Sequence, residues 1–359
     1  TISMHNFSEV GEGYGTDVRY QRTERGDRAD RGGLSLSCVD PQFRCAVVMG
    51  HDDQLLVLPF RHHDSEVDPS ASSNSGGMNS GDPGQEMDID DGGVKPSVSS
   101  LVLQPYVIAL DSKEMQGSVI DMTFLHGNYE PTLLFLIEEP IKTWAGGFSS
   151  ASHTSKLVAV SMNLLQKRNP IIWNIKGLPY DTLSVHGIPG PVGGAILLSS
   201  NAIFYFNQNH NCSVATNGYA AKTVDPKVSP IEPNEKRYNL VLSKQSKLCF
   251  LKNTRSAVLT AENGDIFRLR LVTASNIVTK LVVDHTGNRA DVSSAVSTWD
   301  RNDSRWFTTS PKKGAGLVFL GSWLGDSLLL KYELKSAAGP QSGGAAGGAR
   351  GNDVKRGKL

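Results

Sequence analysis

The sequence predicts an all-β protein, a β-propeller with about four blades of an incomplete ring and with disordered polar loops. Three observations predict this fold class. Short apolar runs rich in β-branched and aromatic residues are separated by Gly, Asn, Asp and Ser. Two of these runs flank an Asn-Gly pair, and similar paired runs recur at a nearly constant interval. No long stretch shows the periodicity of an amphipathic helix.

The clearest element is a hairpin over residues 257–272. Its two apolar runs, 257–261 and 266–272, flank the segment Glu262-Asn263-Gly264-Asp265. Asn-Gly between two apolar runs is the strongest local hairpin signal, because a type I′ turn needs positive φ at both central residues. We therefore expect two antiparallel strands joined by such a turn.

Units similar to this hairpin recur along the chain, at residues 46–60, 132–138, 195–206 and 317–332. Aligned at Leu133, Ile196, Val258 and Val318, the apolar runs are 63, 62 and 60 residues apart. A period of about 60 residues with several strands is typical of repeated β blades, and it exceeds the roughly 40–45 residues of WD-type blades. The 359 residues then hold about four blades.

Polar segments divide the chain. Residues 1–334 are assigned to one propeller region, and disordered insertions are expected at about 8–33 and 62–100. The first alternates Arg with Asp and Glu and has few apolar residues, which is typical of a solvated loop. The second begins with 33 residues that hold eight acidic residues and no Lys or Arg. Residues 335–359 are Gly/Ala-rich and are expected to form a flexible linker or basic tail.

Charge and cysteine content limit the class of protein. Lys+Arg and Asp+Glu both number 36, which disfavours a strongly basic nucleic-acid module. The four cysteines form no C-x-x-C pair, so we expect a reducing nuclear or cytosolic compartment. No apolar run approaches the length of a membrane span. The chain starts at Thr1 rather than Met, which suggests a fragment of a longer protein.

No catalytic or metal-binding motif stands out. The sequence has no G-x-S-x-G elbow, no H-E-x-x-H and no P-loop. His62 and His63 lie beside acidic residues, but a solvated loop explains them better than a metal site. We expect no enzyme activity, no cofactor and no small-molecule substrate.

Basic residues on predicted strands are the binding candidates. In the second run of the hairpin, apolar residues fall on one face and Arg268 and Arg270 on the other. With Lys280 and Lys331, these side chains either form a patch that faces a partner or RNA, or simply keep the outer face of a sheet solvated.

The basic end of the chain carries a second candidate. Lys355, Arg356 and Lys358 belong either to a nuclear-import signal or to a solubilising tail.

Longer stretches of the sequence form a recognisable series. They are 39–45, 56–61, 124–134, 143–146, 161–173, 178–181, 189–194, 205–208 and 319–332. In order and spacing, these stretches resemble the N-terminal region of the largest subunit of the cleavage and polyadenylation specificity factor. Stretch 321–327 is shared with a superfamily that includes the large damaged-DNA-binding subunit, whereas 124–134 and 161–173 resemble the polyadenylation member specifically. The sequence departs from the family pattern at Trp323 and Gly147, where Arg is common.

The resemblance implies a first β-propeller of four-stranded blades with a non-catalytic role in nuclear pre-mRNA 3′-end processing. It implies a scaffold that holds a WD-repeat subunit and a zinc-finger subunit, which read the AAUAAA signal, and it implies RNA binding. No membrane partner is expected. Two alternatives stay open: a ubiquitin-ligase adaptor like the damaged-DNA-binding subunit, and a propeller enzyme with acids or His gathered in its central channel.

Overall fold

A computed structural model provides the structure of the chain. It describes residues 2–6, 15–20, 36–51, 54–61, 102–110, 112–139, 153–220, 231–251, 255–292, 294–298, 315–322 and 325–333. These residues are almost entirely β-structure, with one short 3₁₀ turn, η2, at Lys113–Met115. The all-β prediction is confirmed. In the part of the chain that is described, no helix has the length and apolar character needed to cross a membrane.

Besides one two-stranded sheet near the start of the chain, the strands form five small sheets in chain order, each numbered here by its place in that order. Sheet 1 contains β3 (Ser37–Val39), β4 (Cys45–His51), β5 (Gln54–Pro59) and β6 (Tyr106–Ala109). Sheet 2 contains β7 (Ser118–Leu125), β8 (Thr132–Glu138), β9 (His153–Ser161) and β10 (Ile171–Pro179). Sheet 3 contains β11 (Thr182–Gly187), β12 (Ala195–Ser199), β13 (Ala202–Phe206), β14 (Asn211–Ala215) and the short parallel β15 (Ile231–Glu232).

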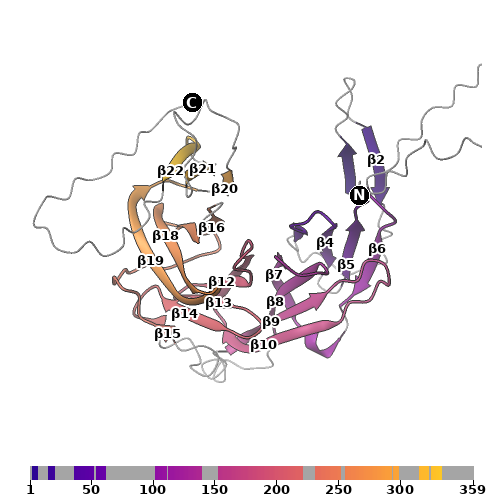
Figure 1. Cartoon of the computed structure of the whole chain (residues 1–359), viewed down its shortest axis with the longest axis horizontal. Helices are drawn as coiled ribbons and strands as arrows, with labels where there is room; N and C mark the ends of the chain where they lie inside the picture. The colour runs from indigo at the N-terminus through magenta and orange to yellow at the C-terminus, as the bar shows by residue number, and fades with distance from the viewer. Residues whose placement is uncertain are drawn as a thin grey trace, which may run out of the picture.

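The last two sheets complete the series. Sheet 4 contains β16 (Lys247–Phe250), β17 (Ser256–Thr260), β18 (Asp265–Ala274) and β19 (Ile277–Arg289). Sheet 5 contains β20 (Ser294–Thr298), β21 (Ala315–Gly321) and β22 (Leu328–Glu333). Figure 1 shows the sheets following one another along an arc that stays open between sheet 1 and sheet 5. This arrangement confirms a propeller with an incomplete ring.

The repeat that predicted the blades has a direct structural counterpart. Leu133, Ile196, Val258 and Val318 all lie on the second strand of their sheets, which are β8, β12, β17 and β21. The unit at 46–60 adds a fifth blade, with β4 and β5 in sheet 1, and the five blades agree with the expectation of about four. That blade is separated from the next by a longer step, and the alignment of four runs did not include it.

Apolar clusters between consecutive sheets hold the arc together. Strand β8 is buried along almost its whole length because both of its faces are covered. Leu133, Phe135 and Ile137 pack toward sheet 1, whereas Leu134 and Leu136 pack toward sheet 3. A run that is apolar at every position is therefore what a strand between two sheets requires.

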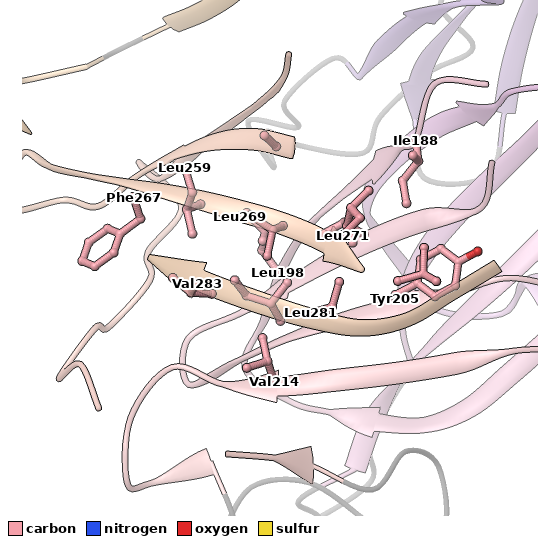
Figure 2. Close-up of a cluster of buried hydrophobic side chains, with 14 of the residues drawn as sticks. Ile188, Leu198, Tyr205, Val214, Leu259, Phe267, Leu269, Leu271, Leu281 and Val283 are labelled. Carbon is pink, nitrogen blue, oxygen red and sulfur yellow. The ribbon is translucent and has the colours of Figure 1, made fainter. Parts of the chain in front are cut away.

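Sheets 3 and 4 are joined by the largest cluster. Figure 2 shows Leu198, Tyr205 and Val214 of sheet 3 facing Leu269 and Leu281 of sheet 4. Sheet 5 packs on the other face of sheet 4 through a smaller cluster around Ile266 and Val318.

The hairpin of sheet 4 forms as predicted, but with a different turn. Strands β17 and β18 pair antiparallel, and Leu259 lies opposite Phe267. Gly264 has a φ of +83°, whereas Asn263 is not among the residues with positive φ. The N–H of Gly264 donates to the carbonyl of Ala261 at 3.0 Å, and the Asn263 side chain accepts from the N–H of Asp265 at 3.1 Å. The type I′ expectation is therefore wrong: one left-handed Gly is enough when the loop is longer than two residues.

The polar segments lie largely outside the described residues. Within 8–33, expected to be a loop, residues Gly15–Tyr20 form β2, which pairs antiparallel with β1 (Ile2–Asn6). A two-stranded ladder depends on backbone groups, so few apolar side chains are needed to form it. The rest of 8–33, the segment 62–100 and the tail 335–359 are not described.

Candidate functional site

The predicted basic residues divide between two sheets. Arg268 and Arg270 on β18 and Lys280 on β19 share one face of sheet 4, the face opposite Leu269 and Leu271. Lys331 lies on β22 of sheet 5, opposite Leu317 of β21, and is exposed. Lys355, Arg356 and Lys358, as well as His62 and His63, lie outside the described residues, as do Trp323 and Gly147. The structure thus brings together three of the four strand candidates.

Acidic side chains meet the arginine and lysine of this face. The Arg270 Nε donates to Oδ2 of Asp284 at 2.7 Å, and its Nη2 lies 3.6 Å from Oε2 of Glu235. The other Glu235 oxygen lies 3.4 Å from the Lys280 Nζ. Two cations and two carboxylates therefore form a network within the chain, and these cations are less available to an outside phosphate than the sequence alone implied.

Arg268 is held differently. Its Nε and Nη2 donate to the Ser256 hydroxyl at 3.3 and 3.0 Å. Burial, and secondarily the neighbouring Arg270, lower the pKa of Arg268, while Asp284 acts in the opposite direction. A half-buried guanidinium with a neutral hydroxyl partner helps to order the strands β17 and β18.

A pocket that the sequence did not predict lies at the β17–β18 turn. Its cavity of about 470 Å³ is lined by Tyr238, Asn239, Leu240, Val241, Glu262, Asn263, Asp265, Phe267 and His285. The Phe267 ring packs edge-on against Tyr238 and His285, with centroid distances of 5.6 and 4.9 Å. The only sequence signal was the Asn-Gly turn itself, because the 238–241 segment reaches the pocket through the tertiary fold.

Charges at this pocket are partly paired. The Arg289 Nε lies 2.7 Å from Oδ1 of Asp265, and the His285 Nε2 lies 3.8 Å from the same oxygen. The N–H of Gly287 donates to Nδ1 of His285 at 3.0 Å, which leaves Nε2 as the protonated nitrogen. An aromatic wall beside carboxylates suits a small apolar or cationic group.

Two titratable residues lie on the first strands of sheets 2 and 3. The carboxylate of Asp121 on β7 accepts from the N–H of Met122 and from the N–H of Val185 on β11, both at 2.8 Å. Burial raises the pKa of Asp121 to about 6, although these two hydrogen bonds act to lower it. Its oxygens join the two sheets.

His186 on β11 lies in an environment that disfavours its charged form. Its Nε2 lies 3.0 Å from the Ser184 hydroxyl. Burial, followed by the charge of Lys247, lowers the pKa of His186 to about 4, so the ring is neutral at pH 7. Among the residues that the structure describes, no three His, Cys, Asp or Glu side chains are grouped as metal ligands.

Sheets 1 and 2 are joined by a polar contact between their turns. Asp40 is buried and forms a bidentate pair with Arg44, at 2.7 Å from Nε and 2.9 Å from Nη2. The Arg44 Nη1 then donates to the carbonyls of Tyr129 at 2.5 Å and Asn128 at 3.3 Å. The β3–β4 turn and the β7–β8 turn are thereby fixed side by side.

Comparison with known proteins places this architecture. Residues 23–353 match the model of the family described as "RSE1/DDB1/CPSF1 first beta-propeller". The "Cleavage and polyadenylation specificity factor subunit 1" of Drosophila melanogaster is 30% identical over 342 residues, which covers 92% of this chain and 20% of the fly protein. The protein of the same name from Arabidopsis thaliana is 30% identical over 298 residues, covering 83% of this chain and 18% of the plant protein.

A fungal relative extends the comparison. "Protein cft1" of Neurospora crassa is 26% identical over 321 residues, covering 83% of this chain and 19% of the fungal protein. The chain thus spans about a fifth of the length of the curated relatives it matches. Because the family model covers all five blades, the chain belongs to the RSE1/DDB1/CPSF1 first beta-propeller family, and its relatives include subunit 1 of the cleavage and polyadenylation specificity factor.

Proposed function

We propose that this chain is the propeller part of a non-catalytic scaffold in the nuclear machinery that cleaves and polyadenylates pre-mRNA. In this role it holds the WD-repeat and zinc-finger subunits that read the poly(A) signal. The observation that carries the proposal is the extent of the match: relatives named as polyadenylation-factor subunit 1 align with 92% and 83% of the chain. The similarity therefore covers the fold as a whole rather than one motif.

The structure supports a scaffold role through its rigidity. Each consecutive pair of sheets shares an apolar cluster, and side chains such as Asp121 and Arg44 join neighbouring sheets by hydrogen bonds. Turns carried by packed sheets keep fixed positions relative to one another, which is what binding surfaces need.

RNA contact is part of the proposal, but as a secondary role for this region. The best strand candidates, Arg270 and Lys280, are already paired with Asp284 and Glu235. Lys+Arg and Asp+Glu are also equal in number, so nothing attracts phosphate over long range. The adaptor of a ubiquitin ligase is not favoured, because the relatives named above are polyadenylation-factor subunits or their fungal counterpart.

A reconstitution experiment tests the scaffold role. The chain is immobilised and offered the purified WD-repeat and zinc-finger subunits, with and without an AAUAAA RNA oligomer, at about 0.1 and about 0.5 M salt. We expect the subunits to be retained without RNA and at both salt concentrations. Retention of RNA alone, falling steeply with salt, would replace the scaffold role with direct RNA binding. Capture of cullins instead of the two subunits would favour the adaptor.

A further inference from the structure

Three apolar side chains stand out by their exposure. Tyr129, Leu165 and Phe43 are 97, 94 and 73% exposed, and no other large apolar residue in the described part of the chain exceeds 61%. Each lies on a turn: Phe43 between β3 and β4, Tyr129 between β7 and β8, and Leu165 between β9 and β10. Single exposed apolar residues need no explanation, but the three most exposed ones belong to just two neighbouring sheets.

The three turns adjoin one another at one end of sheets 1 and 2. Arg44, next to Phe43, donates to the carbonyl of Tyr129 at 2.5 Å. On the other side, the Glu130 carboxylate accepts from the Ser161 hydroxyl at 2.5 Å and from Nδ2 of Asn163 at 2.9 Å. We call Phe43, Tyr129 and Leu165 the tip triad.

The backbone beneath the triad is strained in two places. Phe43 has a φ of +55° and Lys167 a φ of +54°, a region that non-glycine residues with large side chains rarely occupy. The Phe43 conformation is imposed by Asp40, whose carbonyl accepts from the N–H of Phe43 at 2.9 Å and whose Oδ2 accepts from the N–H of Gln42 and Arg44. Such strain persists where surrounding contacts enforce it, and it concentrates at functional positions.

Charge near the triad is positive where it is exposed. Lys167 and Arg168 are exposed on the β9–β10 turn, and Lys167 lies over the Tyr106 ring at 5.3 Å. The acidic groups nearby are already engaged: Asp40 by Arg44, and Glu130 by Ser161 and Asn163. Because Ser161 and Asn163 are neutral, Glu130 keeps its charge, and a partner at this surface would meet projecting apolar groups beside two exposed cations and one half-buried carboxylate.

We propose that the tip triad is a docking surface for a protein partner that offers an apolar groove with acidic side chains at its rim. This inference rests on the proposed function, since the partner is sought among the subunits that the scaffold holds. The three side chains fill the groove, and Lys167 and Arg168 face the acidic rim. Rigid turns reduce the entropy lost on binding, because the anchors are held in place before the partner arrives.

The same residues suit single-stranded RNA less well. Base stacking needs π faces, and Leu165 has none. Arg44, the cation between Phe43 and Tyr129, already donates to Asp40 and to two carbonyls. Phosphate binding would therefore depend on other exposed cations, such as Lys167 and Arg168.

The test compares two sets of variants in the full chain. The first replaces the triad with Phe43→Ser, Tyr129→Ser and Leu165→Ser together. The matched control replaces Tyr219 and Tyr180, which are 61 and 51% exposed, with Ser. Strand β14 leads from the β13–β14 turn to the opposite end of sheet 3, so Tyr219 lies away from the triad. The affinity for the purified WD-repeat and zinc-finger subunits is measured for wild type and both variants, and AAUAAA RNA binding is measured in parallel.

The expected result is at least about a tenfold loss of affinity for one subunit in the triad variant, with the control variant unchanged. The double variant Lys167→Glu and Arg168→Glu should weaken binding of the same subunit and make that binding less dependent on salt. Equal affinity of wild type and triad variant would overturn the inference while leaving the scaffold role intact. Loss of RNA binding alone would also overturn it, in favour of a stacking surface. Failure of wild type to bind either subunit would refute the proposed function, and the inference with it.

A second variant separates binding from folding. Asn tolerates positive φ better than Phe does. Phe43→Asn should therefore raise the melting temperature of the chain while it weakens binding of the subunit. A variant that is both more stable and a poorer binder has not lost binding by unfolding. A more stable variant with unchanged affinity would count against a role for Phe43.

Discussion

Sheet 3 has a neighbour on each face, and its two junctions differ in their polar contacts. Both contain a large apolar cluster, with Leu197 and Phe204 facing sheet 2 and Leu198 and Val214 facing sheet 4. Toward sheet 2, a buried carboxylate, that of Asp121, accepts the N–H of Val185 at 2.8 Å. Toward sheet 4, the corresponding hydrogen bonds are made by a neutral side-chain amide.

That amide belongs to Asn234, just after β15. Its Oδ1 accepts from the N–H of Val283 at 3.0 Å, and its Nδ2 donates to the Val283 carbonyl at 2.8 Å. The amide thus pairs both backbone groups of one residue on β19, as a neighbouring strand would. Similar apolar junctions should therefore respond differently to pH, since only the carboxylate can change its charge near neutrality.

The largest expected effect comes from the apolar part of the junction between sheets 3 and 4. Leu269 is fully buried in it. Leu269→Ala should lower the free energy of unfolding by about 2–5 kcal/mol, because it removes buried methyl groups and leaves a cavity. Urea denaturation measures the loss. Val272→Ala on the same strand, at a side chain that is 40% exposed, is the matched control and should change stability far less.

The two junctions should also differ in how their contribution to the unfolding free energy depends on pH. The pKa of Asp121 is raised from 3.8 to about 6, so the fold favours its protonated form, and its stabilising contribution is lost as pH rises from about 4 to about 6. Asp121→Asn should therefore gain stability relative to wild type by up to about 3 kcal/mol across that range. The readout is the difference in unfolding free energy between variant and wild type at several pH values. A difference that stays constant with pH would contradict the raised pKa.

The contribution of His186 to stability should change with pH in the opposite direction. Its pKa is lowered from 6.5 to about 4, so its contribution is present above pH 6.5 and is lost as pH falls toward 4. In wild type the two slopes oppose each other between pH 4 and 6. His186→Gln should therefore lose stability relative to wild type as pH rises from 4 to 6.5, and a denaturation series over that range would reveal the slope. A variant that tracks wild type at every pH would count against the neutral buried ring.

Substitution of Asn234 should lower the stability by an amount that does not depend on pH. Asn234→Ala removes two hydrogen bonds to Val283 and should cost about 1–2 kcal/mol. The loss should be the same at pH 4 and pH 7, because no titrating group is involved. A pH-dependent loss would mean that the two junctions are not as different as their polar contacts indicate.

The smallest effect is expected on the other face of sheet 4. Arg270→Gln breaks the pairs with Asp284 and Glu235, but its side chain is 35% exposed, so the cost should be below about 1 kcal/mol. Melting temperatures at about 0.1 and about 1 M salt provide the measurement, and the difference from wild type should shrink at the higher salt. An effect comparable to that of Leu269→Ala would show that the ion network is a main stabiliser of the sheet.

Local patterns in the sequence predicted much of this fold. The recurrence of apolar runs at Leu133, Ile196, Val258 and Val318 predicted repeated blades, and each of these runs is the second strand of its sheet. The alternation around Arg268 correctly assigned the two faces of β18.

Long-range partners were beyond those patterns. Asp284 and Glu235 lie 14 and 35 residues from Arg270 in the sequence, and nothing local indicates that they neutralise it. Likewise, the exposure of Phe43, Tyr129 and Leu165 depends on how separate turns meet, which no local pattern in the sequence indicates. The turn at Asn263 was mispredicted because loop length, rather than the Asn-Gly pair, decides the turn type.

All four cysteines of the chain are thiols, and they are distributed over three sheets: Cys38 and Cys45 in sheet 1, Cys212 in sheet 3 and Cys249 in sheet 4. Burial raises the pKa of Cys45 and of Cys212 to about 12, so hardly any reactive thiolate exists at neutral pH while the sheets stay closed. Alkylation of Cys45 therefore requires sheet 1 to open, and alkylation of Cys212 requires sheet 3 to open. The protein carries built-in chemical reporters that can time the opening of individual blades without any added label.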